Sequence, residues 1–181
     1  MRQTILAKRY AKALFAVSQE EGTSEGYRET LNVLGDYLEK HPESMDGLTN
    51  LLYPMELREK VMTHLISALQ ADQFLANFLN LVVQKKRADI LPDIAAEFQA
   101  LVDADQNVSR GTLISATQIS GELQAKIQST LENITGKKVI LASEIDPAII
   151  GGIVAKVGDL VMDGSIKTQL AGLNESIKGS E

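Results

Sequence analysis

The feature that most constrains this fold is a change in the spacing of apolar residues near position 106. Before it, apolar side chains recur every three or four residues, which is the period of an amphipathic helix. After it, stretches such as residues 139–145 alternate between apolar and polar positions, as a half-buried strand requires. A chain of 181 residues is long enough for two small domains. We therefore expect an α+β protein with a helical domain over residues 1–105 and a mixed α/β domain over residues 106–181.

The N-terminal part of the sequence predicts six short helices that pack as a compact bundle. Capping residues and prolines set the expected ends, because Thr23 or Ser24 can cap a helix and Pro42 disfavours helix in the residue before it. The expected helices cover residues 4–20, 24–41, 44–52, 54–69, 73–83 and 91–105.

Each amphipathic helix has one apolar stripe that we expect to face a core. The stripes are Leu6, Tyr10, Leu14 and Val17; Tyr27, Leu31, Leu34 and Leu38; Leu57, Val61, Leu65 and Leu69; Ile94, Phe98, Leu101 and Val102; and, in the second domain, Leu123, Ile127, Leu131 and Ile134.

The fifth expected helix, residues 73–83, differs from the others because it is apolar on more than one side. Phe74, Phe78 and Leu81 lie with Val82 on one arc, and Leu75 and Leu79 lie on another. A helix of this kind is either buried from several directions or keeps one stripe free for a partner. The sequence leaves both interpretations open, including that the two phenylalanines belong to the core.

The C-terminal part predicts the order strand, helix, strand, two hairpin strands, helix. The strands are expected over residues 108–118, 139–145, 152–157 and 160–162, and Gly158-Asp159 suits a type II′ turn between the last two. Ser120 is the expected N-cap of the first helix and Gly136 its C-terminal cap. The final helix carries an apolar seam at steps of four, three and four residues: Ile166, Leu170, Leu173 and Ile177.

Composition excludes several classes of function. The net charge is −6, and the chain therefore lacks the excess of Lys and Arg by which proteins bind nucleic-acid phosphates. The absence of cysteine removes disulfides, thiolate nucleophiles and cysteine zinc sites together. No apolar run approaches the ~20 residues that cross a bilayer, so any membrane association is expected to pass through a partner.

The sequence carries no recognisable catalytic, cofactor or metal site. His41 and His64 lack a partner at metal-ligand spacing, and Leu131 occupies the position where a phosphate loop ending at Lys137 needs glycine. Asp103 with Asp105, and Asp159 with Asp163, are expected in solvated loops. We therefore predict no catalytic residue, cofactor or metal, and expect an adaptor with two helix-binding faces.

Two alternatives remain open from the residues alone. One is a helical adaptor for an unrelated assembly, which would have the same fold and other partners. The other is a small phosphate-handling enzyme that uses Lys137 and the Gly151-Gly152 turn, which would need a closed polar pocket.

Three segments resemble a known family. They are RYAKALF at residues 9–15, DPAIIGGIVAKVGD at 146–159, and Asp163-Gly164-Ser165 before the last helix. Together they are similar to the delta subunit of bacterial and chloroplast F-type ATP synthases, the counterpart of the mitochondrial oligomycin sensitivity conferring protein. The resemblance covers nearly the whole chain. The acidic balance is similar to the bacterial form, because the mitochondrial form tends to be basic.

The resemblance implies a non-catalytic stator protein of the peripheral stalk. Its N-terminal bundle would hold the N-terminal helix of an alpha subunit through its first and fifth helices, and its C-terminal domain would bind the b-type stalk subunits. The residues implied for the alpha subunit are Arg9, Tyr10, Ala13, Leu14, Phe74, Asn77, Phe78 and Leu81. Those implied for the b subunits are Ile166, Leu170, Leu173 and Ile177.

In this role the protein would prevent the catalytic head from turning with the rotor, so that proton flow stays coupled to ATP synthesis. It would lie at the cytoplasmic face of the bacterial plasma membrane as a peripheral part of the complex. The resemblance assigns no contacts to residues 40–70.

Overall fold

A computed structural model describes residues 2–170 of the chain. The chain divides into two compact units, Met1–Val102 and Asp103–Glu181. The first is helical and the second contains a four-stranded sheet, so the expected α+β class is confirmed. Among the described helices, none combines the length and apolar character needed to cross a bilayer.

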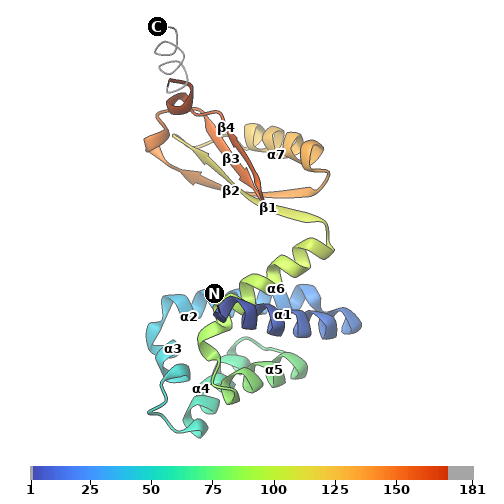
Figure 1. The fold of residues 1–181 in the computed structure, drawn as a ribbon, viewed down its shortest axis with the longest axis vertical. Coiled ribbons are helices and arrows are strands. Elements are labelled where there is room, and N and C mark those ends of the chain that lie inside the picture. The colour runs from blue at the N-terminus through green and yellow to red at the C-terminus, as the bar shows by residue number, and fades with distance from the viewer. Residues whose placement is uncertain (1, 171–181) are drawn as a thin grey trace. The chain divides into compact units, whose positions relative to one another are not determined.

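The helices of the N-terminal unit lie close to the expected positions (Figure 1). The third begins two residues earlier than predicted, because Pro42 occupies its first turn, where a missing N–H has no consequence. The elements are α1 (Arg2–Glu21), α2 (Ser24–Lys40), α3 (Pro42–Thr49), α4 (Met55–Ala68), α5 (Gln73–Gln84), the 3₁₀ turn η1 (Ala88–Ile90) and α6 (Leu91–Asp105).

The predicted inward stripe is confirmed for α2, but for α1 only Leu14 is buried as predicted. Tyr27, Leu31, Leu34 and Leu38 of α2 are all buried. In α1, by contrast, the buried residues are Ala7, Ala11, Leu14 and Ser18, whereas Leu6 and Tyr10 are only half-buried and Val17 is exposed. Small side chains face the core because they let the neighbouring helices approach closely, and the larger apolar side chains lie beside the contact.

A similar correction applies to α4 and α6. In α4, Leu65 is buried as predicted, but Leu57 is exposed and Val61 and Leu69 are half-buried. Arg58 and Met62 take the other inward positions. In α6, Ile94, Phe98 and Val102 are buried as predicted and Leu101 is half-buried. The spacing of apolar residues predicts which stripe of a helix is apolar, but the helices packed against it decide which residues of that stripe are buried.

The C-terminal unit is a four-stranded sheet with the strand order β2-β1-β3-β4. Strands β1 and β2 are parallel, joined through α7, and the other pairs are antiparallel. After β4, residues 166–170 are helical. The elements are β1 (Val108–Ser115), α7 (Gly121–Thr135), β2 (Lys138–Ile145), the 3₁₀ turn η2 (Pro147–Ile149), β3 (Ile153–Val157) and β4 (Leu160–Asp163).

Strand β1 ends three residues before the predicted end at residue 118. The hydroxyl of Ser115 donates a hydrogen bond to the carbonyl of Thr117 at 2.6 Å, which bends the chain away from the sheet. Such local side-chain bonds compete with the ladder of the strand.

The caps of α7 are as predicted, but its inward stripe is not. Ser120 accepts a hydrogen bond from the backbone of Leu123, and Gly136 ends the helix in the left-handed conformation. Leu131 is buried, whereas Leu123 and Ile134 are exposed. The helix therefore covers the sheet with only part of its apolar face.

The turn between β3 and β4 matches the prediction. Val157 pairs with Leu160, so the loop contains only Gly158 and Asp159. Gly158 has a φ of +56° and Asp159 does not have a positive φ. A type II′ turn needs this combination, whereas type I′ needs a positive φ at both residues.

Candidate functional site

The described residues contain no group of three or more histidine, cysteine, aspartate or glutamate side chains placed to hold a metal ion. The imidazole of His41 stacks on the ring of Tyr37 with centroids 4.2 Å apart, and its Nδ1 lies 2.9 Å from the Tyr37 carbonyl oxygen. His64 is exposed on α4. The histidines therefore have local or surface roles here.

One acidic residue expected in a solvated loop has a different role. Asp103 is buried and receives two hydrogen bonds from Arg110, at 2.6 Å from Nε and 3.0 Å from Nη2. The sequence expectation was wrong because Asp103 lies within α6 and faces the first residues of β1. The forked guanidinium joins the end of α6 to the sheet.

An apolar depression of the N-terminal unit lies between α1 and α5. It has a volume of about 420 Å³. Its lining is almost entirely apolar and comprises Ala13, Leu14, Val17, Phe74, Asn77, Phe78 and Leu81. We call this surface the α1–α5 groove.

Three large side chains of the α1–α5 groove are open to solvent. The exposed fractions are 53% for Phe74, 43% for Leu81 and 39% for Val17. The opposite side of α5 is fixed in the core by Leu75 and Leu79, which are buried. The helix therefore keeps one apolar stripe free, and Phe74 is not a core residue.

An aromatic contact shapes one wall of the groove. Tyr10 of α1 and Phe78 of α5 meet edge to face with ring centroids 6.2 Å apart and planes at 71°. Both side chains are half-buried and pack against the main core. They hold α1 and α5 at the spacing that opens the groove.

The structure brings together most of the residues that the resemblance implied for the first partner. Ala13, Leu14, Phe74, Asn77, Phe78 and Leu81 line the groove, and Tyr10 supports Phe78. Arg9 is exposed one turn before Ala13 and is not a lining residue. Val17 lines the groove but was assigned only to the core stripe, because a single periodic pattern cannot separate the two faces.

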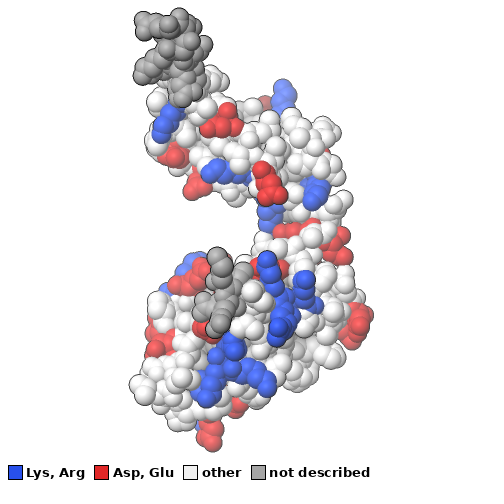
Figure 2. Space-filling model, in the orientation of Figure 1, with Lys and Arg blue, Asp and Glu red and all other residues white. Residues whose placement is uncertain are grey.

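The surface of α1 outside the groove is basic. Lys8, Arg9 and Lys12 are all exposed. Figure 2 shows lysine and arginine side chains gathered on the visible face of this unit, although the whole chain is acidic. Lys8 lies 3.8 Å from the Glu97 carboxylate of α6, on the side of α1 away from the groove. Arg9, one turn before Ala13, is the basic residue of this group that lies next to the groove.

In the C-terminal unit, the two glycine motifs noted in the sequence pack against each other. The backbone N–H of Gly164 donates to the carbonyl of Ile153 at 2.9 Å, and that of Ile166 donates to Gly151 at 3.0 Å. A Cβ on Gly152, whose φ is +82°, would collide with the carbonyl oxygen of Gly164. Close backbone approach, and not phosphate binding, thus explains the Gly151-Gly152 pair.

Asp163 holds Ser165, the N-cap of the helical residues that follow, whose hydroxyl accepts a hydrogen bond from the Thr168 backbone N–H at 3.3 Å. Its carboxylate accepts hydrogen bonds from the Ser165 backbone N–H at 2.9 Å and from the Thr168 hydroxyl at 2.8 Å. The bonds from Ser165 and then from Thr168 lower the pKa of the Asp163 carboxyl below its usual value. The structure thus corrects the expectation of a solvated loop at this residue.

The residues proposed for the second partner are only partly described. Ile166 and Leu170 are exposed on the helical residues after Asp163. Leu173 and Ile177 lie outside the described residues.

A second apolar groove, which the sequence did not indicate, lies between α7 and strands β3 and β4. Its volume is about 500 Å³, and it exposes Leu123 and Met162. The position of this groove depends on the order of the strands in the sheet, which the sequence alone does not give.

Comparison with known proteins gives consistent results. Residues 6–177 match the family described as ATP synthase delta (OSCP) subunit. The chain is 59% identical over 181 residues to ATP synthase subunit delta of Desulfotalea psychrophila, covering 100% of both chains. It is 39% identical to the protein of that name from Desulfosudis oleivorans, covering 100% of this chain and 99% of the relative.

A solved structure has the same fold. It is a chain of the Toxoplasma gondii mitochondrial ATP synthase hexamer, with a TM-score of 0.74 and 23% sequence identity, covering 95% of this chain and 97% of that one. With the family match over nearly the full length, the protein belongs to the ATP synthase delta (OSCP) subunit family, a non-catalytic component of the peripheral stalk of that complex.

Proposed function

We propose that the two units of this stalk subunit hold different partners. The N-terminal unit, a bundle of helices, binds the N-terminal helix of an alpha subunit in the α1–α5 groove. The C-terminal unit binds the ends of the b-type stalk subunits. The chain thereby ties the catalytic head to the stalk, so that the torque of the rotor drives ATP synthesis instead of turning the head.

The observation that carries the first half is the exposed apolar stripe of α5 opposite α1. A groove of this kind matches the apolar face of an amphipathic helix with anchors at steps of three and four residues. Burying one large apolar side chain contributes about 1.5–3 kcal/mol before entropy losses. Val17, Phe74 and Leu81, with the edge of Phe78, offer enough surface for a stable contact.

Support for the second half comes from the apolar surface of the C-terminal unit. Ile166 and Leu170 are exposed after β4, and the groove between α7 and β3–β4 exposes Leu123 and Met162. Stalk helices that cover this surface would complete a unit whose own helix α7 leaves part of the sheet open. In this arrangement the protein is peripheral, at the cytoplasmic face of the plasma membrane, and reaches the membrane only through its partners.

A matched pair of leucine variants tests the groove. Leu81→Asp places a charge in the groove, and Leu52→Asp places the same charge on the α3–α4 loop, where the leucine is 89% exposed. Leu81 is preferable to Tyr10 or Phe78, because those two half-buried side chains also pack against the core.

The measurement is calorimetric titration of the full chain with a synthetic peptide covering the N-terminal segment of the alpha subunit from the same complex. We expect Leu81→Asp to weaken binding by roughly 100-fold or more, since a charge must then be buried against apolar surface. Leu52→Asp should bind like the wild type. Equal binding by both variants would refute the groove assignment.

A further inference from the structure

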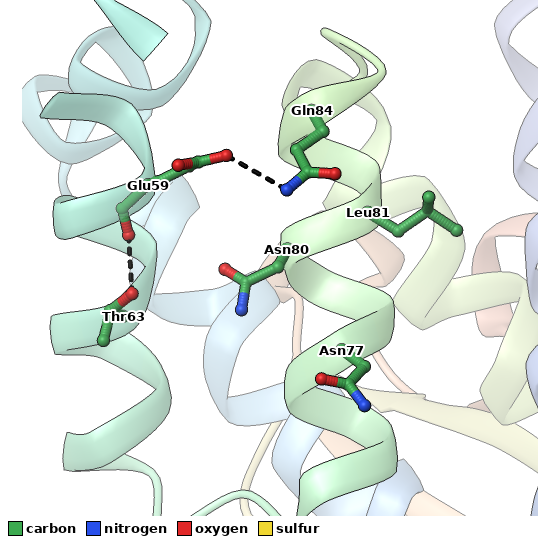
Figure 3. A pocket seen from close by; sticks show the side chains of 6 residues that line it. All are labelled: Glu59, Thr63, Asn77, Asn80, Leu81 and Gln84. Atoms are coloured by element: carbon green, nitrogen blue, oxygen red, sulfur yellow. Dashed lines mark hydrogen bonds between the residues drawn. The ribbon is translucent and has the colours of Figure 1, made fainter. Parts of the chain in front are cut away.

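A second hollow adjoins the α1–α5 groove on the other side of α5. It lies between α4 and α5 and has a volume of about 410 Å³ (Figure 3). Asn77 and Leu81 line both hollows, so the two are continuous across the exposed ridge of α5. The lining residues are Glu59, Thr63, Asn77, Asn80, Leu81 and Gln84. We call this hollow the α4–α5 cleft.

The cleft is polar where the groove is apolar. Figure 3 shows the amides of Asn80 and Gln84 directed toward α4, whereas Leu81 points away from it. The same helix therefore presents an apolar edge to one side and a row of carboxamides to the other. A helix lying along α5 would meet both surfaces.

Two side chains of the cleft donate hydrogen bonds to Glu59. The Gln84 side-chain N–H donates to the Glu59 carboxylate at 3.0 Å, and the Thr63 hydroxyl donates to the Glu59 backbone carbonyl at 2.8 Å. The Oδ1 atom of Asn77 accepts one hydrogen bond, from the Gln73 side chain at 3.1 Å.

Two side chains of the cleft, Asn80 and Glu59, can accept further hydrogen bonds. The Oδ1 atom of Asn80 is buried and has no hydrogen-bond partner among the described residues. The Glu59 carboxylate uses one oxygen for Gln84 and carries a negative charge. A buried acceptor without a donor is unfavourable by about 1–3 kcal/mol, so a ligand that donates hydrogen bonds here would be stabilised.

The charge of Glu59 defines the class of ligand. A phosphate or carboxylate would be repelled, and a divalent ion prefers several carboxylate ligands where the cleft offers one. A lysine ammonium or arginine guanidinium carries several donors and no acceptor, which complements Glu59 and Asn80.

We propose that the α4–α5 cleft receives a lysine or arginine side chain from the helix docked in the α1–α5 groove. This inference rests on the proposed function. The basic residue would lie on the edge of the partner helix that faces α4, and the exposed Arg9 would favour an acidic residue on the edge that faces α1. Opposite charges on the two sides fix the orientation of the docked helix.

The experiment uses the same alpha-subunit peptide and the full-length chain. Glu59→Gln removes the charge and Asn80→Leu removes the buried acceptor with little change of volume. Glu29→Gln, on the exposed surface of α2, is the matched control for charge. A peptide series replaces each lysine and arginine singly by methionine.

We expect Glu59→Gln and Asn80→Leu each to weaken binding about ten-fold or more, and Glu29→Gln to have no effect. One peptide of the series should bind the wild-type chain more weakly than the parent peptide by the same factor. The same peptide should bind Glu59→Gln with the affinity of the parent peptide. Raising the salt concentration should reduce the difference between wild type and Glu59→Gln.

The outcomes separate this inference from the proposed function. If Leu81→Asp abolishes binding while both cleft variants bind like the wild type, the cleft inference is wrong and the groove stands. If cleft variants lose affinity but no peptide substitution is coupled to Glu59, the inference is also overturned. If the wild-type chain does not bind the peptide, the proposed function fails first.

Discussion

The two units of this protein differ in how completely they bury their own apolar surface. In the N-terminal unit, helices α1 to α6 all contribute buried side chains to one core. Among the described residues of the C-terminal unit, the buried core is smaller and contains Leu113, Leu131, Val139, Ala155 and Val157. Among the described residues, the first unit therefore has the larger core, and we expect it to be the more stable of the two.

The exposed apolar residues are also distributed differently. In the N-terminal unit the α1–α5 groove is a stripe between two helices that fits one partner helix. In the C-terminal unit, Leu123, Met162 and Ile166 come from a helix, a strand and the residues after β4. The groove of the first unit therefore has the shape of a single helix, whereas the exposed apolar residues of the second unit form a broader surface.

The largest effect should come from the dense core of the N-terminal unit. Phe98 is fully buried and meets Phe15 edge to face with centroids 6.0 Å apart. Phe98→Ala should lower the free energy of unfolding by about 3–5 kcal/mol, because it leaves a cavity among packed helices. Urea unfolding with hydrogen–deuterium exchange read separately for each unit measures this loss.

Leu101→Ala is the control, since the half-buried Leu101 lies in the same helix at the edge of the core. It should destabilise the unit much less. Equal losses for Phe98→Ala and Leu101→Ala would contradict the description of a dense core centred on Phe98.

A smaller loss should follow from disturbing the turns of the C-terminal unit. Gly152→Ala places a Cβ against Gly164 and 3.0 Å from the Cα of Ser165, at a φ of +82°. We expect the free energy of unfolding of this unit to fall by about 2–3 kcal/mol, because the strain and the collision separate β3 from the residues after β4. Hydrogen exchange should accelerate in residues 103–170 and not in the N-terminal unit.

Gly158→Ala distinguishes the collision from the backbone strain. Gly158 also has a positive φ, +56°, but a Cβ there would meet nothing within 4 Å. Gly158→Ala should lower the free energy of unfolding by about 1 kcal/mol. A loss as large as that of Gly152→Ala would show that close packing of the two glycine motifs is unimportant.

The smallest effect concerns pH. Because hydrogen bonds from Ser165 and Thr168 lower the pKa of Asp163 in the folded state, its ionised form favours folding at pH values above its unfolded pKa of about 4. This contribution disappears as pH falls through the lower, folded pKa. Asp163→Asn should therefore unfold at slightly lower temperature than the wild type at pH 7, and the gap should close below about pH 4.

Thermal unfolding of both chains from pH 7 to pH 3 measures this gap. A difference in unfolding temperature that is constant over the whole range would contradict a role for the ionised carboxylate.

Sequence reasoning succeeded where structure is local. The stripe of α2, the caps Ser120 and Gly136 and the Gly158-Asp159 turn depend on neighbours within a few residues, and each is as predicted. The mixed class followed from the change of periodicity near residue 106. The order of the motifs also sufficed to indicate the family.

Sequence reasoning failed where the answer depends on how elements approach one another. Ala7, Ala11 and Ser18 take the inner face of α1 because small side chains permit close packing, which apolar periodicity does not reveal. The bond between Asp103 and Arg110 needs a turn of the chain between them. The α1–α5 groove residues were indicated by resemblance, but not Val17, and nothing in the sequence indicated the α4–α5 cleft.

The sequence by itself determined the helices, strands, caps and family of this protein, because periodicity, turn residues and motif order are properties of short segments. Only the tertiary structure decided which apolar side chains are covered and which stay open on α5. That choice depends on the distance between α1, α4 and α5, and therefore on the packing of residues far apart in the chain.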